Sequence, residues 1–404
     1  MIPYTLRIIV YLIIALYILV SAYIRIKMHF WHTQPVFHIY NLKYWWRPPG
    51  TINRAPPPVN KFVNLSNNKL IKVEEDTGAD TGADTGANIY ANICAFIRAN
   101  YVIHDSTVYK PSDEDILAYL QSANQPAFLN VYQETPLPFL QTPEMIGVTS
   151  ARLLNVTLRK KKELIALPVY YIDNLCVKPG YRKKGIAPEM IQTFYYTLSR
   201  ANPKVNAYLF KREGQLNAIV PLVCYDTYVF DMTHYQADTV LTGAYTLTEI
   251  GLPQLSLCIG FIKAQITQFE CVILPDVSHV IHLLKLGKLK FYGFLFQGQL
   301  IALYVFRILA LSYDTKKAVE CIAILSADKN PEVLIAGFNM SWQKISAASQ
   351  CVMVIMEETA HSKVVRKALD AHPSVGRHFK SPTAFFLYNY AAYSIPSAKA
   401  LLIY

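Results

Sequence analysis

The segment from Tyr171 to Pro188, YIDNLCVKPGYRKKGIAP, combines residue types that can hold an anion. Its first part has the apolar character of a β-strand, and a short basic loop with glycines then leads into a helix expected to begin at Pro188. Free backbone N–H groups at a helix N-terminus, together with Arg182, Lys183 and Lys184, can bind a pyrophosphate group. Strand–basic loop–helix units are common by chance, so the pattern alone predicts only a phosphate site.

Two further groups of reactive side chains are expected to be inert. Cys176 lies among apolar strand residues and no histidine has a spacing that compels a dyad, so we interpret it as a buried thiol. His279 and His282 have the spacing of ligands on one helix face, but no third ligand accompanies them in the sequence, and no metal site is predicted. The seven cysteines include no C-x-x-C pair and indicate reduced thiols.

The last five residues, ALLIY, form an apolar tail that ends at Tyr404. Such a tail is more stable when buried, which would bring the terminal carboxylate into the protein. Burial disfavours the charged form of a carboxylate and makes it a stronger base. The alternative from the residues alone is an ordinary terminal strand whose carboxylate lies at the surface.

Several motifs, in their order along the chain, resemble those of the N-myristoyltransferases, a family of the GNAT acyltransferase superfamily. Residues 29–36, HFWHTQPV, resemble the family's Lys-Phe-Trp-x-Thr-Gln-Pro-Val segment, and residues 174–188 resemble its Asn-Leu-Cys-Val strand with the loop that holds the coenzyme A pyrophosphate. Residues 386–390, FLYNY, are similar to its Tyr-Leu-Tyr-Asn-Trp, and residues 100–109 are a fainter match. The resemblance covers nearly everything from Met28 to Tyr404.

The resemblance implies an α/β (α+β) fold of two GNAT-like halves related by a pseudo-two-fold axis, with acyl-CoA on the N-terminal half. It implies transfer of a fatty acyl group, typically tetradecanoyl (myristoyl), from acyl-CoA to the amine of an N-terminal glycine. Acyl-CoA would be a co-substrate, with no prosthetic group, metal or covalent acyl-enzyme. The expected partners are acyl-CoA and proteins that begin with glycine, and the expected state is a monomer.

Residue roles also come from the resemblance. The backbone N–H groups of Asn174 and Leu175 would form an oxyanion hole for the thioester carbonyl, and the carboxylate of Tyr404 would be the base that accepts a proton from the amine. The candidates for peptide binding are Val102, Asp105, Tyr109 and Tyr225. The residues expected to bind the coenzyme are His29, Phe30, Trp31, Leu175, Cys176, Val177, Arg182, Lys183, Lys184, Gly185, Ile186, Ala187 and Pro188.

The sequence departs from the family pattern mainly on the peptide side. The acidic run that follows Asn-Tyr-Val in the family is reduced here to Asp105, and the Gly-Asp-Gly before Leu-Tyr-Asn is replaced by residues around Lys380. We therefore expect weaker recognition of basic peptides than the family often shows. The coenzyme side is better kept than the peptide side.

The residues from Ile8 to Ile24 are uncharged and would rise about 26 Å as a helix, close to the least that spans a bilayer. Arg25, Lys27, Lys43 and Arg47 follow this span and only Arg7 precedes it, so the positive-inside rule predicts a single-pass membrane protein with its large C-terminal part in the cytosol. The alternative is a cleaved signal peptide, because Val20-Ser21-Ala22 is an acceptable cleavage site.

Helical and strand patterns alternate along the rest of the chain and indicate an α/β or α+β protein with two sheets. The expected domains are the anchor (1–27), the Phe-Trp motif with a proline-rich strap (28–65), a flexible Asp-Thr-Gly-Ala linker (66–88), the acyl-CoA half (89–205) and the peptide half (206–404). Helices are expected at 89–100, 113–122, 188–199 and 331–346, and strands at 145–158, 163–177, 351–356 and 384–390.

The composition sets limits on the class of protein. The chain has 404 residues, a net charge of +11 and 52% hydrophobic residues, which excludes a disordered chain. The positive charge suits an anionic ligand or a membrane surface, and because the basic residues are spread out, no nucleic-acid partner is expected. Two functions remain as alternatives to glycine acylation: a related acyltransferase with another amine acceptor, and a module that binds acyl-CoA or an acylated protein without chemistry.

Overall fold

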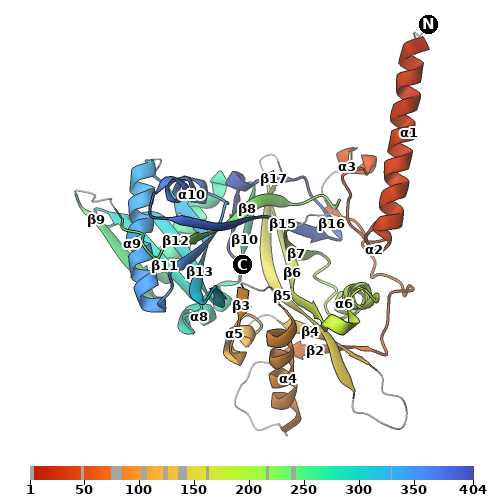
Figure 1. The fold of residues 1–404 in the computed structure, drawn as a ribbon, viewed down its shortest axis with the longest axis horizontal. Helices are drawn as coiled ribbons and strands as arrows, with labels where there is room; N and C mark the ends of the chain where they lie inside the picture. Colours follow the sequence, from red (N-terminus) through yellow and green to blue (C-terminus); the bar gives the residue numbers. More distant parts are fainter. Residues whose placement is uncertain are drawn as a thin grey trace.

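The computed structural model describes residues 4–46, 50–73, 84–101, 107–121, 126–134, 143–160, 163–214, 218–237, 243–328 and 330–404. Figure 1 shows a body of mixed helices and strands, with one long N-terminal helix that stands out from it. The α-helices are α1 (Tyr4–Lys27), α2 (His29–His32), α3 (Leu42–Trp46), α4 (Asp84–Asn100), α5 (Asp113–Leu117), α6 (Ile186–Ala201), α7 (Leu255–Gln265), α8 (Val277–Lys285), α9 (Pro331–Ser349) and α10 (Ser362–Ala371).

The strands are joined into a 16-stranded sheet, and β1 and β16 form a separate two-stranded sheet. The strands are β1 (Gly50–Thr51), β2 (Asn68–Val73), β3 (Thr107–Tyr109), β4 (Ala127–Glu134), β5 (Glu144–Lys160), β6 (Glu163–Val177), β7 (Tyr208–Glu213), β8 (Val223–Asp231), β9 (Tyr245–Ile250), β10 (Cys271–Leu274), β11 (Leu289–Phe296), β12 (Gln299–Tyr313), β13 (Lys316–Ser326), β14 (Met353–Glu357), β15 (Gly376–Tyr388), β16 (Tyr390–Ala391), β17 (Ile395–Pro396) and β18 (Ala400–Leu402).

Two stretches of chain build the same arrangement. In the N-terminal half, β4, β5 and β6 pair antiparallel, α6 follows, and β7 pairs parallel to β6. In the C-terminal half, β11, β12 and β13 pair antiparallel, α9 follows, and β14 pairs parallel to β13. This repeat confirms the prediction of two GNAT-like halves in a mixed α/β fold.

Each half also receives a strand from the other. β8 follows β7 in the chain but pairs with β14, whereas β15 follows β14 but pairs with β7. β8 and β15 pair with each other and so join the halves into one sheet. The prediction of two main sheets is therefore wrong, because this exchange of strands makes the larger sheet continuous.

The predicted helices and strands are confirmed as helices and strands, but some of them begin or end at other residues than predicted. The hairpin of β5 and β6 and the helices α4 and α9 lie where the sequence predicts them, whereas α5 already ends at Leu117. The helix α6 begins at Ile186, two residues before Pro188. A proline is still tolerated there, because the N–H groups of the first turn have no intrahelical partner.

The segment 66–88 is not a flexible linker throughout. Residues 68–73 form β2, which pairs with β4 because the alternating NKLIKV sequence suits a half-buried strand and turns Val73 into the core. The last Asp-Thr-Gly-Ala copy begins α4 at Asp84. Residues 74–83 lie outside the described residues.

The N-terminal helix α1 has 24 residues and none of them is buried. It is long and apolar enough to cross a membrane, although a signal sequence has the same character. In Figure 1 it projects from the body, with α2 at its base and α3 beside it.

Candidate functional site

The strand β6 is irregular at Asn174, where the sequence places the oxyanion hole. The register of β5 and β6 shifts between Val148 and Ser150, so that Asn174 and Leu175 together face a single residue, Thr149. Asn174 has a φ of 53°, in the left-handed region that asparagine tolerates better than most residues. Such a bulge bends a strand and turns its backbone groups out of the ladder.

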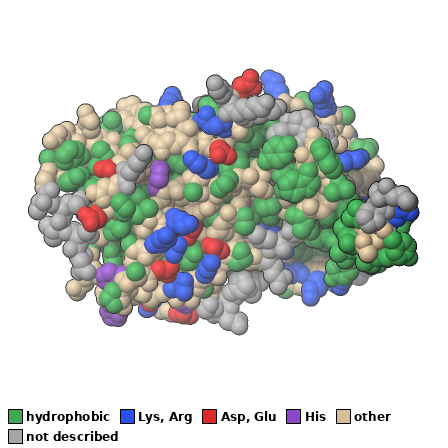
Figure 2. All heavy atoms as spheres, turned by 90° about the horizontal axis from the view of Figure 1, so that it is seen from above, with side chains coloured by type: hydrophobic (Ala, Val, Ile, Leu, Met, Phe, Trp, Pro, Cys, Tyr) green, Lys and Arg blue, Asp and Glu red, His purple; other side chains and the backbone are tan. Residues whose placement is uncertain are grey.

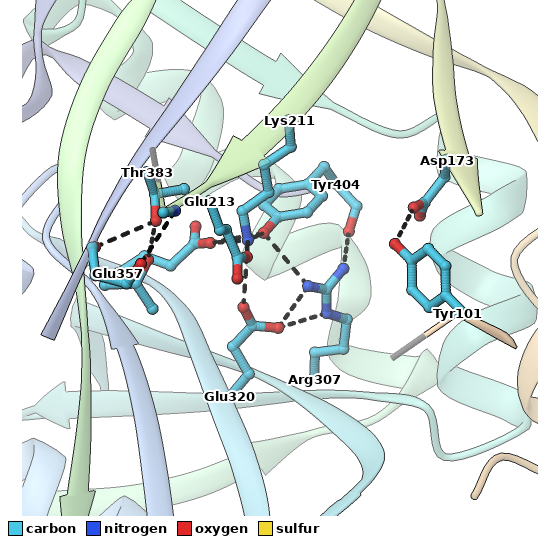
Figure 3. A network of polar contacts seen from close by, with 12 residues as sticks. Tyr101, Asp173, Lys211, Glu213, Arg307, Glu320, Glu357, Thr383 and Tyr404 are labelled. Atoms are coloured by element: carbon cyan, nitrogen blue, oxygen red, sulfur yellow. Dashed lines mark hydrogen bonds and ion pairs between the residues drawn. The ribbon is translucent and has the colours of Figure 1, made fainter. Parts of the chain in front are cut away.

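The bulge is held by local hydrogen bonds, one of which occupies a candidate donor. The Asn174 side chain donates to Ser150 Oγ at 3.0 Å, and its backbone N–H donates to Oδ1 of Asp173 at 2.8 Å. The Tyr101 hydroxyl donates to the same Asp173 oxygen at 3.0 Å (Figure 3). In this structure the Asn174 N–H is therefore already engaged by Asp173, and its role in an oxyanion hole stays a prediction.

An apolar cavity of about 310 Å³ lies on one side of the bulge. This volume is near the lower end for small-molecule sites. Trp31 and Leu175 line it, as do side chains of α6, and Trp31 stacks on Phe210 with ring centroids 5.7 Å apart. The predicted coenzyme residues Trp31 and Leu175 therefore lie together on this wall.

A second cavity, of about 450 Å³, lies on the other side and is more polar. Tyr109, Arg152, Glu213, Arg307 and Tyr404 are on its wall. The two cavities share the residues Tyr101, Ile172, Asp173, Asn174 and Lys211. The bulge of β6 is thus the point where an apolar and a polar cavity meet.

The terminal residue Tyr404 is buried, as its apolar neighbours predict, with an exposed fraction of 3%. Strand β18 holds the tail by pairing parallel to β10. The main-chain oxygen of Tyr404 accepts a hydrogen bond from Arg307 Nη1 at 3.5 Å. The end of the chain therefore lies beside a buried guanidinium, on the wall of the polar cavity.

The phenol of Tyr404 belongs to a buried network of charged side chains (Figure 3). It accepts from Lys211 Nζ at 2.7 Å and donates to Glu357 Oε1 at 2.7 Å. Lys211 also pairs with Glu357 at 2.7 Å, and Arg307 pairs with Glu320 at 2.5 Å. Each of these four charged side chains thus has an opposite partner, which a low-dielectric site requires.

These neighbours set the protonation of the network. Burial alone would lower the pKa of Lys211, but Glu357 and other negative neighbours raise it well above its ordinary value. Burial raises the pKa of Glu357, and Lys211 opposes that change. Lys211 therefore stays charged, and it carries this charge at the place where the two cavities meet.

The basic loop after β6 is only partly free to bind phosphate. Arg182 donates from Nε to the Val177 carbonyl at 2.9 Å and from Nη2 to the Asn100 carbonyl at 3.0 Å, so its guanidinium ties the loop to α4 and β6. Lys183 and Lys184 are exposed. Gly185, with a φ of 88°, begins α6 without a side-chain cap. The two lysines and this helix end remain suited to an anion.

Other predicted coenzyme residues do not reach the apolar cavity. Cys176 and Val177 are buried in packing clusters, and burial raises the pKa of the Cys176 thiol to about 12, as expected of an inert cysteine. Ile186 is buried beside Val177, with Ala187 packed against the same cluster and Pro188 half-buried. Phe30 packs edge-on against Phe62, and His29 contacts Lys61.

The predicted peptide residues have separate outcomes. Tyr109 lies on the wall of the polar cavity. Tyr225 does not line it and is instead buried beside Phe385, so that its hydroxyl is inside the core. Val102 and Asp105 lie outside the described residues.

The histidine pair on α8 shows no sign of a metal site. His279 is buried, and burial lowers its pKa to about 3. The described residues contain no cluster that could hold a metal.

The sequence reasoning missed the charged residues of the network. Arg307, Glu320 and Glu357 each stand in a mainly apolar strand, for example YVFRIL around Arg307 and VMVIME up to Glu357, whereas Lys211 is followed by two further charged residues. A charge within an apolar strand is a signal that could have identified them, because a buried charge must be paired.

Comparisons with known proteins give a match in structure only. No family model and no curated protein matches the sequence. Solved structures of Saccharomyces cerevisiae N-myristoyltransferase with bound myristoyl-CoA match over 91% of this chain and 94% or 90% of theirs, with TM-scores of 0.66 and 0.67 and 14% sequence identity. A structure of that enzyme with myristoyl-CoA and inhibitors matches equally, over 91% of each chain. This chain therefore has the fold of the N-myristoyltransferases.

Proposed function

We propose that this chain is a member of the N-myristoyltransferase family and transfers a fatty acyl group, tetradecanoyl in the first instance, from acyl-CoA to the N-terminal glycine amine of a protein. The observation that carries the proposal is the meeting of an apolar and a polar cavity at the bulge of β6, with Tyr404 on the polar wall. The matched yeast enzyme was crystallised with bound myristoyl-CoA, and three segments here resemble motifs of that family, with a fourth, fainter match.

In this proposal the apolar cavity takes the acyl chain and the polar cavity takes the acceptor. The thioester carbonyl would then lie at Asn174 and Leu175, where backbone N–H groups can stabilise the developing charge. Lys183, Lys184 and the start of α6 would bind the coenzyme phosphates. No prosthetic group is needed, because amine attack on a thioester needs only positioning, charge stabilisation and a base.

The terminal carboxylate of Tyr404 is the proposed base. An α-amino group has a pKa of about 8, so at neutral pH most of the amine is protonated and must lose a proton before it can attack. The tail is held in place by β18 and by the buried phenol of Tyr404, and Arg307 lies beside the main-chain oxygen. A fixed carboxylate at this wall would reach an amine that enters through the polar cavity.

The test uses the full chain in detergent with tetradecanoyl-CoA and a glycine-starting peptide, with the product identified by mass spectrometry. A variant extended by a few residues after Tyr404 should bind acyl-CoA and lose nearly all turnover, because the carboxylate is displaced. An alanine-starting peptide is the matched control for the acceptor. Full turnover by the extended variant would contradict the role of the terminal carboxylate.

A binding module without chemistry is the second candidate, and one observation favours it. Asp173 accepts the Asn174 N–H, and a carboxylate at that point would repel an oxyanion. Tight binding of acyl-CoA without release of free coenzyme thiol, for any glycine-starting, lysine-containing or small amine acceptor, would establish this candidate. Thiol release with a lysine or small amine alone would instead indicate a related acyltransferase.

We also propose that α1 anchors the chain in a membrane with the body in the cytosol. The helix has no buried residue, and Arg25 and Lys27 follow its apolar part. Protease added to sealed vesicles that contain the full chain should digest the body only when it lies on the outer side. An N-terminus cleaved after Ala22 would show a signal peptide instead.

A further inference from the structure

A group of large apolar side chains lies exposed beside α1. Ile39, Leu42, Trp45 and Trp46 have exposed fractions of 61%, 50%, 61% and 77%, and we refer to these four residues as the indole patch. The view along α1 shows hydrophobic side chains gathered at this end of the molecule, with Lys and Arg side chains near them (Figure 2). Exposed tryptophans next to each other are costly in water, which indicates a partner.

The patch is part of a fixed surface. Tyr44 of α3 is buried, donates its hydroxyl to the Ala392 carbonyl at 3.3 Å and accepts from the Ser394 N–H at 3.2 Å. Its ring also packs against Phe37 and Tyr393 at 5.6 and 5.7 Å. Because α3 is attached to the body through Tyr44, Trp45 and Trp46 remain on the outside.

The segment that carries the indole patch, residues 39–46, lies beside the C-terminal part of α1. Tyr40 is close enough to Tyr17 and Arg25 to interact with both electrostatically, and its hydroxyl is 3.3 Å from His32 Nδ1. Tyr17 precedes Arg25 by eight residues, or about 12 Å along a helix. A bilayer that contains the apolar part of α1 would therefore reach the level of residues 39–46.

We propose that the indole patch inserts into the membrane interface beside α1 and fixes the orientation of the body on the bilayer. Tryptophan is the residue most suited to this depth, because its ring is apolar and its N–H can meet the headgroups. Lys43, Arg25 and Lys27 would lie among the phosphates. A bilayer is favoured over a protein partner because the patch continues directly from a helix that is itself exposed and apolar.

The orientation matters for the site. Trp31 follows the end of α1 by four residues and lines the apolar cavity, so two fixed points on the bilayer would keep that cavity close to the lipid. This consequence rests on the proposed anchor and acyl-CoA site, but insertion of the patch does not depend on catalysis.

The experiment places the full chain in phosphatidylcholine nanodiscs whose lipids are brominated in the upper part of the acyl chains. Bromine quenches tryptophan at short range, and two of the four tryptophans belong to the patch, so roughly half of the emission should be lost. The variant W45F/W46F should lose much less. As a matched control, Val277→Trp in the W45F/W46F background adds an exposed tryptophan at α8, away from α1 (Figure 1), and that tryptophan should not be quenched.

Three results would overturn the inference in distinguishable ways. A chain that remains outside the lipid fraction disproves the anchor and the patch together. A chain that inserts but shows equal quenching with and without Trp45 and Trp46 retains the anchor and disproves the patch. A detergent-stable dimer that W45F/W46F abolishes would assign the patch to a second copy of the chain and would also overturn it.

Discussion

The two halves share one arrangement of strands and helix, but the bulges of their third strands have different surroundings. Both third strands have a bulge just beyond their parallel pairing: β6 at Asn174 and Leu175, and β13 at Ile322, where the register with β12 shifts. Asn174 faces two cavities, whereas Ile322 is fully buried among apolar side chains. A register shift at the matching place therefore faces two cavities in one half and apolar packing in the other.

The space beyond each bulge differs for a clear reason. Beyond the pairing of β13 and β14, a later segment bonds to the chain: His361 N donates to the Ile324 carbonyl at 3.2 Å, and Ala360 N donates to the Ala400 carbonyl at 3.0 Å. A cavity lined by Ser326, Asn330 and His361 lies farther along, at the start of α9. Between β6 and β7 the corresponding space is the apolar cavity. The space directly beside the bulge is therefore occupied by a later segment in the C-terminal half and is a cavity in the N-terminal half.

The two helix starts differ in the same sense. Asn330 caps α9 by accepting from the Glu332 N–H at 3.0 Å, and Asp328 lies just before it. At α6 the cap position is Gly185, without a side-chain cap, and Lys183 and Lys184 precede it. The residues just before α6 therefore carry more positive charge than those just before α9, where Asp328 and Lys329 cancel, and an anion is favoured at α6.

The largest expected effect concerns the occupied donor of the N-terminal bulge. Asp173→Ala removes the acceptor of the Asn174 N–H and leaves this donor open. One oxyanion donor contributes roughly 100-fold to a rate. We therefore expect acceptor-independent hydrolysis of tetradecanoyl-CoA to rise toward that factor, as measured by release of the free thiol.

Asp173→Asn is the matched control, because its side-chain oxygen can still accept from the same N–H. Its hydrolysis should stay close to that of the unchanged chain. Equal hydrolysis in both variants would show that the Asp173 contact does not limit the bulge.

The next prediction fills the apolar cavity of the N-terminal half with a larger side chain. Ile191 of α6 lines the apolar cavity, and Ile191→Trp would fill part of its 310 Å³. Overpacking costs of about 1–3 kcal/mol correspond to roughly a tenfold to hundredfold loss of acyl-CoA affinity. Calorimetric titration would measure it, with exposed Lys344→Trp on α9 as the control that should bind normally.

Much of this comparison could be predicted from the sequence, and part of it could not. The loop from Lys178 to Gly185 was identified because a basic run between a strand and a helix start is a local pattern. The contact of Asp173 with its neighbour's N–H depends on one side-chain rotamer at a bulge, which no periodicity reports. The burial of Tyr225 beside Phe385 was not predicted, because an alternating strand does not show which of its faces meets a cavity.

The network around Tyr404 shows the same limit at longer range. Lys211, Arg307 and Glu357 come from three strands that are far apart in sequence, and only the exchange of β8 and β15 between the halves brings them together. Burial of the tail was predictable from its composition. Its partners were not, because pairing depends on the register of the whole sheet.

A smaller effect is expected from the charge difference between the two helix starts. Lys183→Glu with Lys184→Glu should weaken binding of acyl-CoA about tenfold at low salt, since each exposed charge contributes on the order of 1 kcal/mol or less. The difference in acyl-CoA affinity between this double variant and the unchanged chain should become smaller as the salt concentration rises. Lys344→Glu with Lys367→Glu makes the same change in charge on the C-terminal half and should leave binding unaltered. An equal loss in both double variants would mean that net charge, and not the loop, attracts the coenzyme.

The last prediction concerns the stability of the C-terminal half, where no effect on acyl-CoA binding is expected. A Cβ atom at Gly337 of α9 would lie 2.3 Å from the Tyr304 hydroxyl, which donates to the Leu334 carbonyl at 2.8 Å in the same core. Gly337→Ala should therefore lower the free energy of unfolding by about 1–3 kcal/mol, because the core is already filled. Gly260→Ala on α7 meets open space and should instead raise it by up to about 1 kcal/mol. Thermal unfolding would measure the stability of both variants, and calorimetric titration should find the same acyl-CoA affinity in each. Reduced affinity in Gly337→Ala would show that packing in the C-terminal half is coupled to the N-terminal half through the shared sheet.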